Sequence, residues 1–137
     1  MPIMYKAVPK TQPGVVGGGQ IKYYAGIVRE RPMILRKFAS EISNMSTLTT
    51  TDVYAVLESF LDRLYIYLEE GRIVSLGDLG SFSPNISGSG EINPEDVNKD
   101  SIRKLRVNFR PGVELKDRLS KVKFEKVSNG TIEQPAP

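Results

Sequence analysis

The chain has 137 residues, with 19 Lys/Arg against 16 Asp/Glu for a net charge of +3, and it contains no Cys, His or Trp. This length suits one domain with a modest core. Without Cys and His, disulfides, thiolate nucleophiles, histidine-dependent triad hydrolases and the usual zinc sites are excluded. No apolar run approaches the roughly 20 residues that span a bilayer, so we expect a cytoplasmic protein.

The small net charge conceals an uneven distribution along the chain. Residues 1–50 carry seven basic and two acidic side chains, residues 51–100 three and ten, and residues 101–137 nine and four. A basic, acidic and again basic chain can fold with both basic ends on one face, which creates a local positive field. The alternative is that the charges only keep the protein soluble.

Two strands are predicted near the N-terminus, over residues 3–8 and 21–28, because both segments are rich in β-branched and aromatic residues. The connection between them is rich in Pro and Gly. Its run Gly17-Gly18-Gly19 does not indicate a nucleotide-binding loop, since no Gly-Lys-Ser/Thr follows to open a helix. Residues 1–30 are therefore expected to form a β extension.

Two helices are predicted next. The first is amphipathic, has Pro32 in its first turn and ends near Asn44. The second opens with a capping box at Thr49–Asp52 and runs to Glu70, before Gly71. Its apolar residues cover roughly half of the circumference, wider than the ~100° stripe of a singly buried helix. This width predicts burial against both its own core and a second subunit; the alternative is a central helix in a monomer.

A β-hairpin is predicted after the helices. Strands are expected at residues 72–76 and 81–86, around a tight turn at 77–80, and again at 102–109. The polar and acidic segment 87–101 between the last two reads as a mobile hairpin tip. In the last strand Leu105, Val107 and Phe109 share one face, whereas Lys104, Arg106 and Asn108 share the other.

The C-terminal part is predicted to contain one more helix and a short strand. Pro111 is expected in the first turn of a helix from Gly112 to about Lys121. The alternating run 122–127 could pair with an N-terminal strand. Residues 128–137 are expected to be a disordered tail.

Two motifs resemble the bacterial histone-like HU/IHF DNA-binding family. They are Val74-Ser75-Leu76-Gly77-Asp78-Leu79-Gly80-Ser81-Phe82, and Val107-Asn108-Phe109-Arg110-Pro111-Gly112 followed by Leu115-Lys116-Asp117. The resemblance covers about residues 31–122. The two strands before it resemble a subgroup of the family with an N-terminal extension, and residues 123–137 would follow as a short strand and tail.

The resemblance implies an α+β fold in which an intertwined homodimer places a helical base under a β-sheet saddle, with β-hairpin arms at about residues 86–102. A heterodimer would fit the same fold. It implies an architectural protein of the nucleoid that binds double-stranded DNA, bends it and inserts its arms in the minor groove. It implies no catalytic residue, cofactor, metal or small-molecule substrate.

Site residues follow from the same resemblance. The DNA-binding candidates are Arg103, Lys104, Arg106, Arg110 and Lys116, with Pro94 of Asn93-Pro94 as the candidate wedge between base pairs. The expected dimer interface contains Tyr54, Leu57, Phe60, Leu61, Leu64, Tyr65, Leu68, Phe82 and Phe109.

The arm is where the chain departs from the family, whose arms are usually basic. Between Phe82 and Lys99 there is no Lys or Arg, and the segment carries Glu91, Glu95 and Asp96. This predicts weaker DNA binding and less bending. It also leaves open a dimeric protein–protein interaction module of the same fold with weak or no DNA binding. A catalytic Mg²⁺ site at Glu95, Asp96 and Asp100 is disfavoured, because a mobile tip supplies no preorganising shell.

Overall fold

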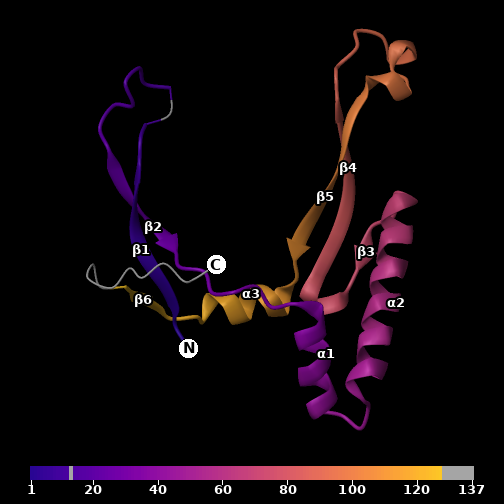
Figure 1. Ribbon diagram of the computed structural model, residues 1–137. Helices are drawn as coiled ribbons and strands as arrows, with labels where there is room; N and C mark the ends of the chain where they lie inside the picture. The colour runs from indigo at the N-terminus through magenta and orange to yellow at the C-terminus, as the bar shows by residue number, and fades with distance from the viewer. Residues whose placement is uncertain (13, 128–137) are drawn as a thin grey trace. The chain divides into compact units, whose positions relative to one another are not determined.

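The computed structural model describes residues 1–12 and 14–127, which form two compact units (Figure 1). The first comprises Met1–Pro32 and the chain from Ser120 onward, and the second Met33–Leu119. The described residues contain three α-helices and two three-stranded sheets, so the α+β class is confirmed. The predicted tail at residues 128–137 lies outside the described residues.

The first unit is a small sheet with the strand order β2-β1-β6. β1 (Ile3–Lys10) and β2 (Lys22–Ile27) are antiparallel, as their β-branched and aromatic content predicted. β6 (Phe124–Lys126) joins the other edge of β1 in parallel, with Phe124 opposite Ile3. The predicted pairing between the C-terminal run and an N-terminal strand is therefore confirmed, and it brings two basic segments of the chain into one sheet.

The second unit begins with a helical hairpin of α1 (Leu35–Asn44) and α2 (Thr50–Glu69). At the start of α2 the Thr49 side chain accepts a hydrogen bond from the Asp52 backbone N–H at 3.2 Å, and its hydroxyl donates to the Asp52 carboxylate at 2.7 Å. The helix ends before Gly71, whose φ of +79° turns the chain away. Both predicted ends of α2 are confirmed within a residue.

A three-stranded sheet with the order β3-β4-β5 follows the helices. β3 (Val74–Ser75) pairs with the start of β4 (Gly80–Gly88), and β4 pairs with β5 (Ile102–Pro111) as a long ribbon (Figure 1). The ribbon tip contains two short 3₁₀ turns, Pro94–Asp96 and Lys99–Ser101. The unit's last helix is α3 (Val113–Ser120).

Both prolines that were predicted to lie in the first turn of a helix lie before the helix instead. α1 begins only after Ile34, which is extended, so Pro32 precedes the helix by three residues. Pro111 is the last residue of β5 and lies opposite Gly80. The physical reason is that the fixed φ of proline, about −65°, fits an extended chain as well as a first helical turn. The strand predicted at 72–76 is also shorter: it covers only Val74–Ser75, and the chain turns at Gly77, which has a φ of +62°.

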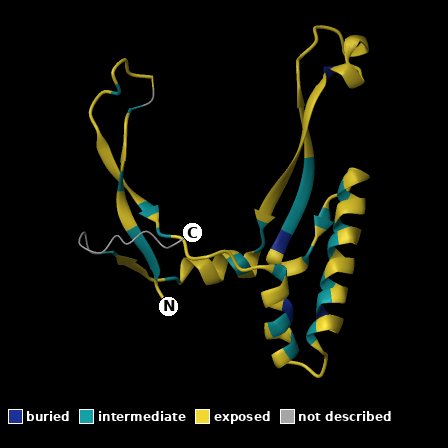
Figure 2. Cartoon of the chain, in the orientation of Figure 1, coloured by how far each residue is buried: buried dark blue, intermediate teal, exposed yellow. Residues whose placement is uncertain are grey.

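Few side chains are buried within this chain (Figure 2). Among the described hydrophobic residues only Ala39 on α1 and Val53 on α2 fall in the buried class. The rings of Phe82 and Phe109 meet across the base of the ribbon with their centroids 5.0 Å apart. Large apolar surfaces therefore stay open on both helices and on the sheet, which is unusual for a domain that acts alone.

The base of the ribbon requires glycine at position 80. Gly80 has a φ of +140°, and a Cβ there would collide with the carbonyl oxygen of Arg110. We expect Gly80→Ala to lower the free energy of unfolding by about 2–4 kcal/mol, seen as a lower Tm in a circular dichroism melt. Gly90→Ala is the control, since a Cβ at Gly90 meets no atom within 4 Å. Equal melting of the two variants would contradict this account.

Candidate nucleic-acid interface

The β4–β5 ribbon has one apolar and one basic face. Residues directly opposite each other in an antiparallel pair project to the same side of a sheet. On one side lie three apolar pairs: Phe82 with Phe109, Pro84 with Val107, and Ile86 with Leu105. On the other side lie four polar pairs: Ser81 with Arg110, Ser83 with Asn108, Asn85 with Arg106, and Ser87 with Lys104. We call the second set the ribbon's basic face.

The basic face presents cations and neutral hydrogen-bonding groups only. None of its eight positions carries a carboxylate. Lys104, Arg106 and Arg110 are exposed, and in the described part of the chain no ion pair ties them to an acidic side chain. Guanidinium, ammonium, hydroxyl and amide groups are the side-chain donors that proteins direct at phosphate oxygens. The face is therefore chemically suited to a polyanion.

The structure does not bring all five predicted cations to this face. The ladder shifts register between Ser87, opposite Lys104, and Gly88, opposite Ile102, so Arg103 is the extra residue of a bulge. Lys116 is exposed on α3, the helix that follows the ribbon base. Lys104, Arg106 and Arg110 thus form one row, and the other two cations lie outside it.

The ribbon tip is folded rather than open. Pro94 begins a 3₁₀ turn after Asn93, whose side-chain amide donates to the Asp96 carboxylate at 3.5 Å. Asn98 and Ser101 form a reciprocal capping box around the second turn. Pro94 is exposed, and the acidic residues Glu95 and Asp96 stand directly beside it.

One exposed apolar residue at this tip is not among the predicted site residues. Ile92 is 99% exposed, although it is two positions from the candidate wedge Pro94. Apolar side chains of this kind insert between base pairs in proteins that bind the minor groove. The available signal was an isoleucine in a mostly polar and acidic segment, where Val97 is the other large aliphatic residue.

The apolar half of α2 divides into two stripes. Leu57, Leu61, Leu64 and Leu68 recur at helical spacing and are half-buried against the rest of the unit. A neighbouring stripe contains Val56 and Phe60, which are 63% and 45% exposed, and Tyr67. We call this second set the outer stripe of α2. One part of the broad apolar face is therefore covered by the chain itself, and the other part is open.

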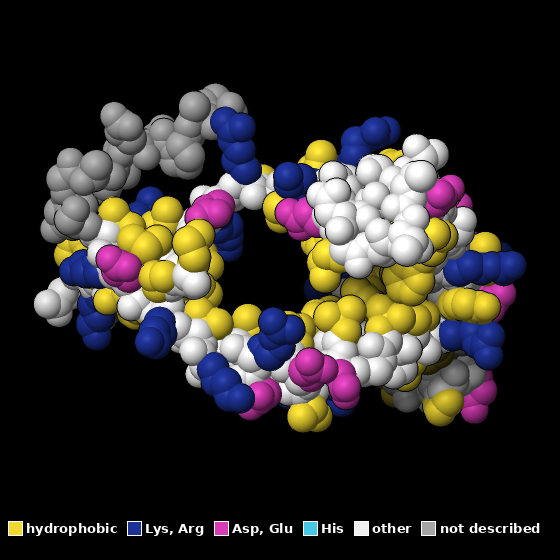
Figure 3. Space-filling model, turned by 90° about the horizontal axis from the view of Figure 1, so that it is seen from below, with side chains coloured by type: hydrophobic (Ala, Val, Ile, Leu, Met, Phe, Trp, Pro, Cys, Tyr) yellow, Lys and Arg dark blue, Asp and Glu magenta, His cyan; other side chains and the backbone are white. Residues whose placement is uncertain are grey.

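The nine predicted interface residues fall on both sides of that division. Leu57, Leu61, Leu64, Leu68, Tyr54 and Phe82 are half-buried within the chain, whereas Phe60, Tyr65 and Phe109 are exposed. Tyr54 already has partners: Arg36 lies over its ring at 5.2 Å, and a hydrogen bond to Glu58, with the charge of that carboxylate, raises the pKa of the phenol. In Figure 3, hydrophobic side chains (yellow) are open to the surface on the side of the molecule seen from below.

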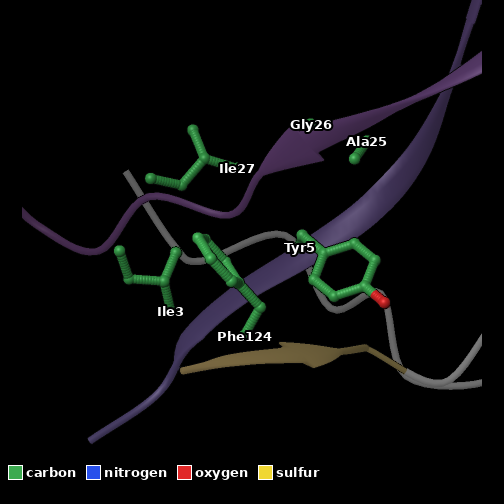
Figure 4. Close-up of a pocket in the computed structure, with 6 residues that line it drawn as sticks. All are labelled: Ile3, Tyr5, Ala25, Gly26, Ile27 and Phe124. Atoms are coloured by element: carbon green, nitrogen blue, oxygen red, sulfur yellow. The ribbon is translucent and has the colours of Figure 1, made fainter. Parts of the chain in front are cut away.

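The first unit has an apolar pocket of about 600 Å³ on one side of its sheet. Figure 4 shows the lining residues, which come from all three strands: Ile3, Tyr5, Ala25, Gly26, Ile27 and Phe124. With no titratable acid or base other than the Tyr5 phenol in this lining, the pocket offers apolar contact rather than catalytic chemistry.

Acidic side chains do not gather into a metal site in the described chain. No group of three or more carboxylates lies close enough to hold a metal ion, so Glu95, Asp96 and Asp100 do not come together as an Mg²⁺ site would require. No helix formed by the described residues has the length and apolar character needed to cross a bilayer.

Comparisons with known proteins agree with this architecture. None of the curated proteins compared with the chain matches it significantly. A solved structure from Bacteroides vulgatus ATCC 8482, described as a "putative bacterial DNA binding protein", shares the fold with a TM-score of 0.64 and 11% sequence identity. The alignment covers 94% of this chain and 50% of that one, so this chain spans about half the length of its structural neighbour.

The family comparison covers nearly the whole chain. Residues 1–126 match the model described as "HU-HIG: HU domain fused to wHTH, Ig, or Glycine-rich motif". The match includes the N-terminal strands as well as the two motifs that resemble HU/IHF proteins. The chain with the long amphipathic ribbon and the added N-terminal sheet thus belongs to the HU-HIG family.

Proposed function

We propose that this chain is a dimeric architectural protein that binds duplex DNA largely independently of sequence, through the ribbon's basic face. The observation that carries the proposal is the alternation along β5, which puts Lys104, Arg106 and Arg110 on one side of the ribbon. The other side of the ribbon carries the three apolar pairs described above. Contacts from such a row go to phosphates, which are the same in every sequence. Membership of the HU-HIG family and the fold of the Bacteroides neighbour support the proposal.

The proposed DNA-binding domain spans residues 31–122, with its arm at about 86–102 and residues 1–30 and 123–137 flanking it. Arg103 and Lys116 would add contacts from the bulge and from α3. In the minor groove, Pro94 or the neighbouring Ile92 would act as the wedge. The carboxylates of Glu95 and Asp96 would repel the flanking phosphates, so we expect weaker binding and less bending than a basic arm would produce. The site of action would be the DNA of the nucleoid.

The proposed assembly is a homodimer. The outer stripe of α2 and the apolar side of the ribbon are open in the single chain, where Val107 is 51% exposed and Ile86 63%. Burying an apolar side chain contributes about 1.5–3 kcal/mol, so these surfaces favour association strongly. An intertwined pair of this fold would cover both with the same surfaces of a second copy.

A salt titration tests the DNA proposal. Fluorescence anisotropy of a labelled random-sequence duplex is measured at several salt concentrations. If three cations of each subunit neutralise one phosphate each, the log–log slope of affinity against salt is about −5 for a dimer. Adding Arg103 and Lys116 would bring it to about −9. Absence of binding at low salt would overturn the proposal.

The alternative function, a protein–protein interaction module, is favoured by the acidic tip. It predicts a stable dimer that binds DNA weakly or not at all, even at low salt. Duplexes of different sequence should bind with equal affinity under our proposal, and energy transfer between labelled duplex ends reports bending. A strong preference for one duplex would contradict sequence-independent binding.

A further inference from the structure

The sheet of the first unit also has two chemically different faces. One face carries Ile3, Tyr5, Ala7, Pro9, Tyr23, Ala25, Ile27 and Phe124, together with Lys126. The opposite face carries Met4 across from Glu125, Lys6 across from Gly26, Val8 across from Tyr24, and Lys10 across from Lys22. Lys6, Lys10 and Lys22 are all exposed. We call these three residues the lysine face.

The chain's positive charge lies mainly in this unit. Its described residues carry eight Lys/Arg against two Asp/Glu, a net charge of +6. The second unit carries eleven against thirteen, a net charge of −2. The unit that contains the proposed DNA-binding ribbon is therefore slightly acidic overall, and the small sheet has the stronger positive field for attracting a polyanion.

Lys10 and Lys22 stand directly opposite each other, which is unfavourable by itself. Like charges in directly opposed positions of an antiparallel pair destabilise a sheet. The Nζ of Lys10 lies 5.5 Å from the centroid of the Tyr24 ring, which keeps the ammonium group over this face. In the described part of the chain neither lysine is in an ion pair.

The carboxylate of the sheet lies on this same face, near Lys6 but far from the Lys10–Lys22 pair. The three strands contain one carboxylate, Glu125, which lies opposite Met4. Met4 and Lys10 are six residues apart along β1, or about 20 Å at the rise of a strand. A bound anion would offset the repulsion between Lys10 and Lys22.

We propose that the lysine face is a second DNA-contacting surface, which binds the phosphate backbone in addition to the ribbon. The proposal rests on the DNA binding proposed above. Lysine ammonium groups act as point charges toward phosphate, and a phosphate between Lys10 and Lys22 converts their repulsion into two attractive contacts. The apolar opposite face has no comparable chemistry, so the two faces would serve different contacts.

The test uses the full chain and a matched pair of double variants. Lys10→Gln with Lys22→Gln removes two charges from the lysine face. Lys37→Gln with Arg63→Gln removes two exposed charges from α1 and α2. Removing a like-charge pair relieves repulsion, so the first variant should fold at least as well, which circular dichroism melts verify. Anisotropy titrations on the random-sequence duplex then give the affinity and the salt slope of each protein.

The expected result is a salt slope shallower by about 1.8 per subunit for the lysine-face variant, at about 0.9 per lost phosphate contact. The Lys37/Arg63 control should keep the wild-type slope, and Lys10→Arg with Lys22→Arg should restore it. If the lysine-face variant behaves like the control while Arg106→Gln with Arg110→Gln weakens binding, this inference fails and the ribbon proposal stands.

The reverse outcome separates the two proposals. If the lysine-face variant weakens binding and the ribbon variant does not, the lysine face is the DNA site and the ribbon proposal fails. If wild type does not bind DNA at low salt, both fail. Vesicles of phosphatidylglycerol and phosphatidylcholine provide the other polyanion: a loss of vesicle binding with unchanged DNA binding would overturn the inference in favour of a membrane surface.

Discussion

Replacing Arg106 and Arg110 by Gln is expected to weaken binding of random-sequence duplex DNA on the order of 100-fold or more at low salt, through four lost phosphate contacts in a dimer. The side chains lie two pairs apart on the ribbon's basic face, opposite Asn85 and Ser81. Neutral Gln keeps hydrogen-bonding groups on the face and removes only the charge. The loss should therefore shrink as salt is raised.

The salt dependence distinguishes a direct contact from a general change in charge. The variant's log–log slope should be shallower by about 3.6 for the dimer. Lys37→Gln with Arg63→Gln removes the same number of charges from exposed positions on α1 and α2, and its slope should stay at the wild-type value. Equal affinities and slopes for both variants would place the DNA site elsewhere.

Replacing Phe60 by Lys is expected to convert the proposed dimer into a less stable monomer. Phe60 belongs to the outer stripe of α2 and is 45% exposed in the single chain. In a symmetric dimer the substitution removes two buried rings and places two ammonium groups against apolar surface, so the dissociation constant should rise at least ~100-fold. Light scattering should change from twice 15.2 kDa to 15.2 kDa.

The control for this prediction is Ala55→Lys. Ala55 is exposed on the polar side of the same helix, at helical spacing from Glu58 and Asp62. The new charge there should leave both mass and Tm close to those of wild type. A wild-type protein that is monomeric at all concentrations, or a Phe60→Lys variant that remains a dimer of equal stability, would contradict the proposed interface.

Local patterns predicted most of the elements, because their causes lie within a few residues. The side chains of Thr49 and Asp52 cap α2 directly, and a glycine with positive φ at position 71 ends it. Period-two alternation assigned Lys104 and Arg106 to one side of β5 and Leu105 and Val107 to the other, and the ladder to β4 confirms this assignment. Proline was the unreliable signal, since Pro32 precedes α1 by three residues and Pro111 ends the strand β5.

The candidate site was predicted in part. Alternation cannot reveal a bulge, so the exclusion of Arg103 from the row of cations required the register of β4 against β5. Nor does alternation within one segment reveal which distant strand lies opposite. That Lys10 faces Lys22, on a sheet completed by β6, follows only from the pairing.

The sequence by itself determined the elements, the two-sided character of the ribbon and the breadth of the apolar face on α2, because each depends on the 2.0 or 3.6 residue period of the local backbone. Tertiary structure decided which part of that face the chain covers and which it leaves open as the outer stripe. It also decided how the charges gather, since β1, β2 and β6 are far apart in the chain but neighbours in one sheet. Charge acts through space, so the net charge of a unit depends on which distant segments pair with each other. The pairing gathers a net charge of +6 in the first unit and leaves −2 in the second.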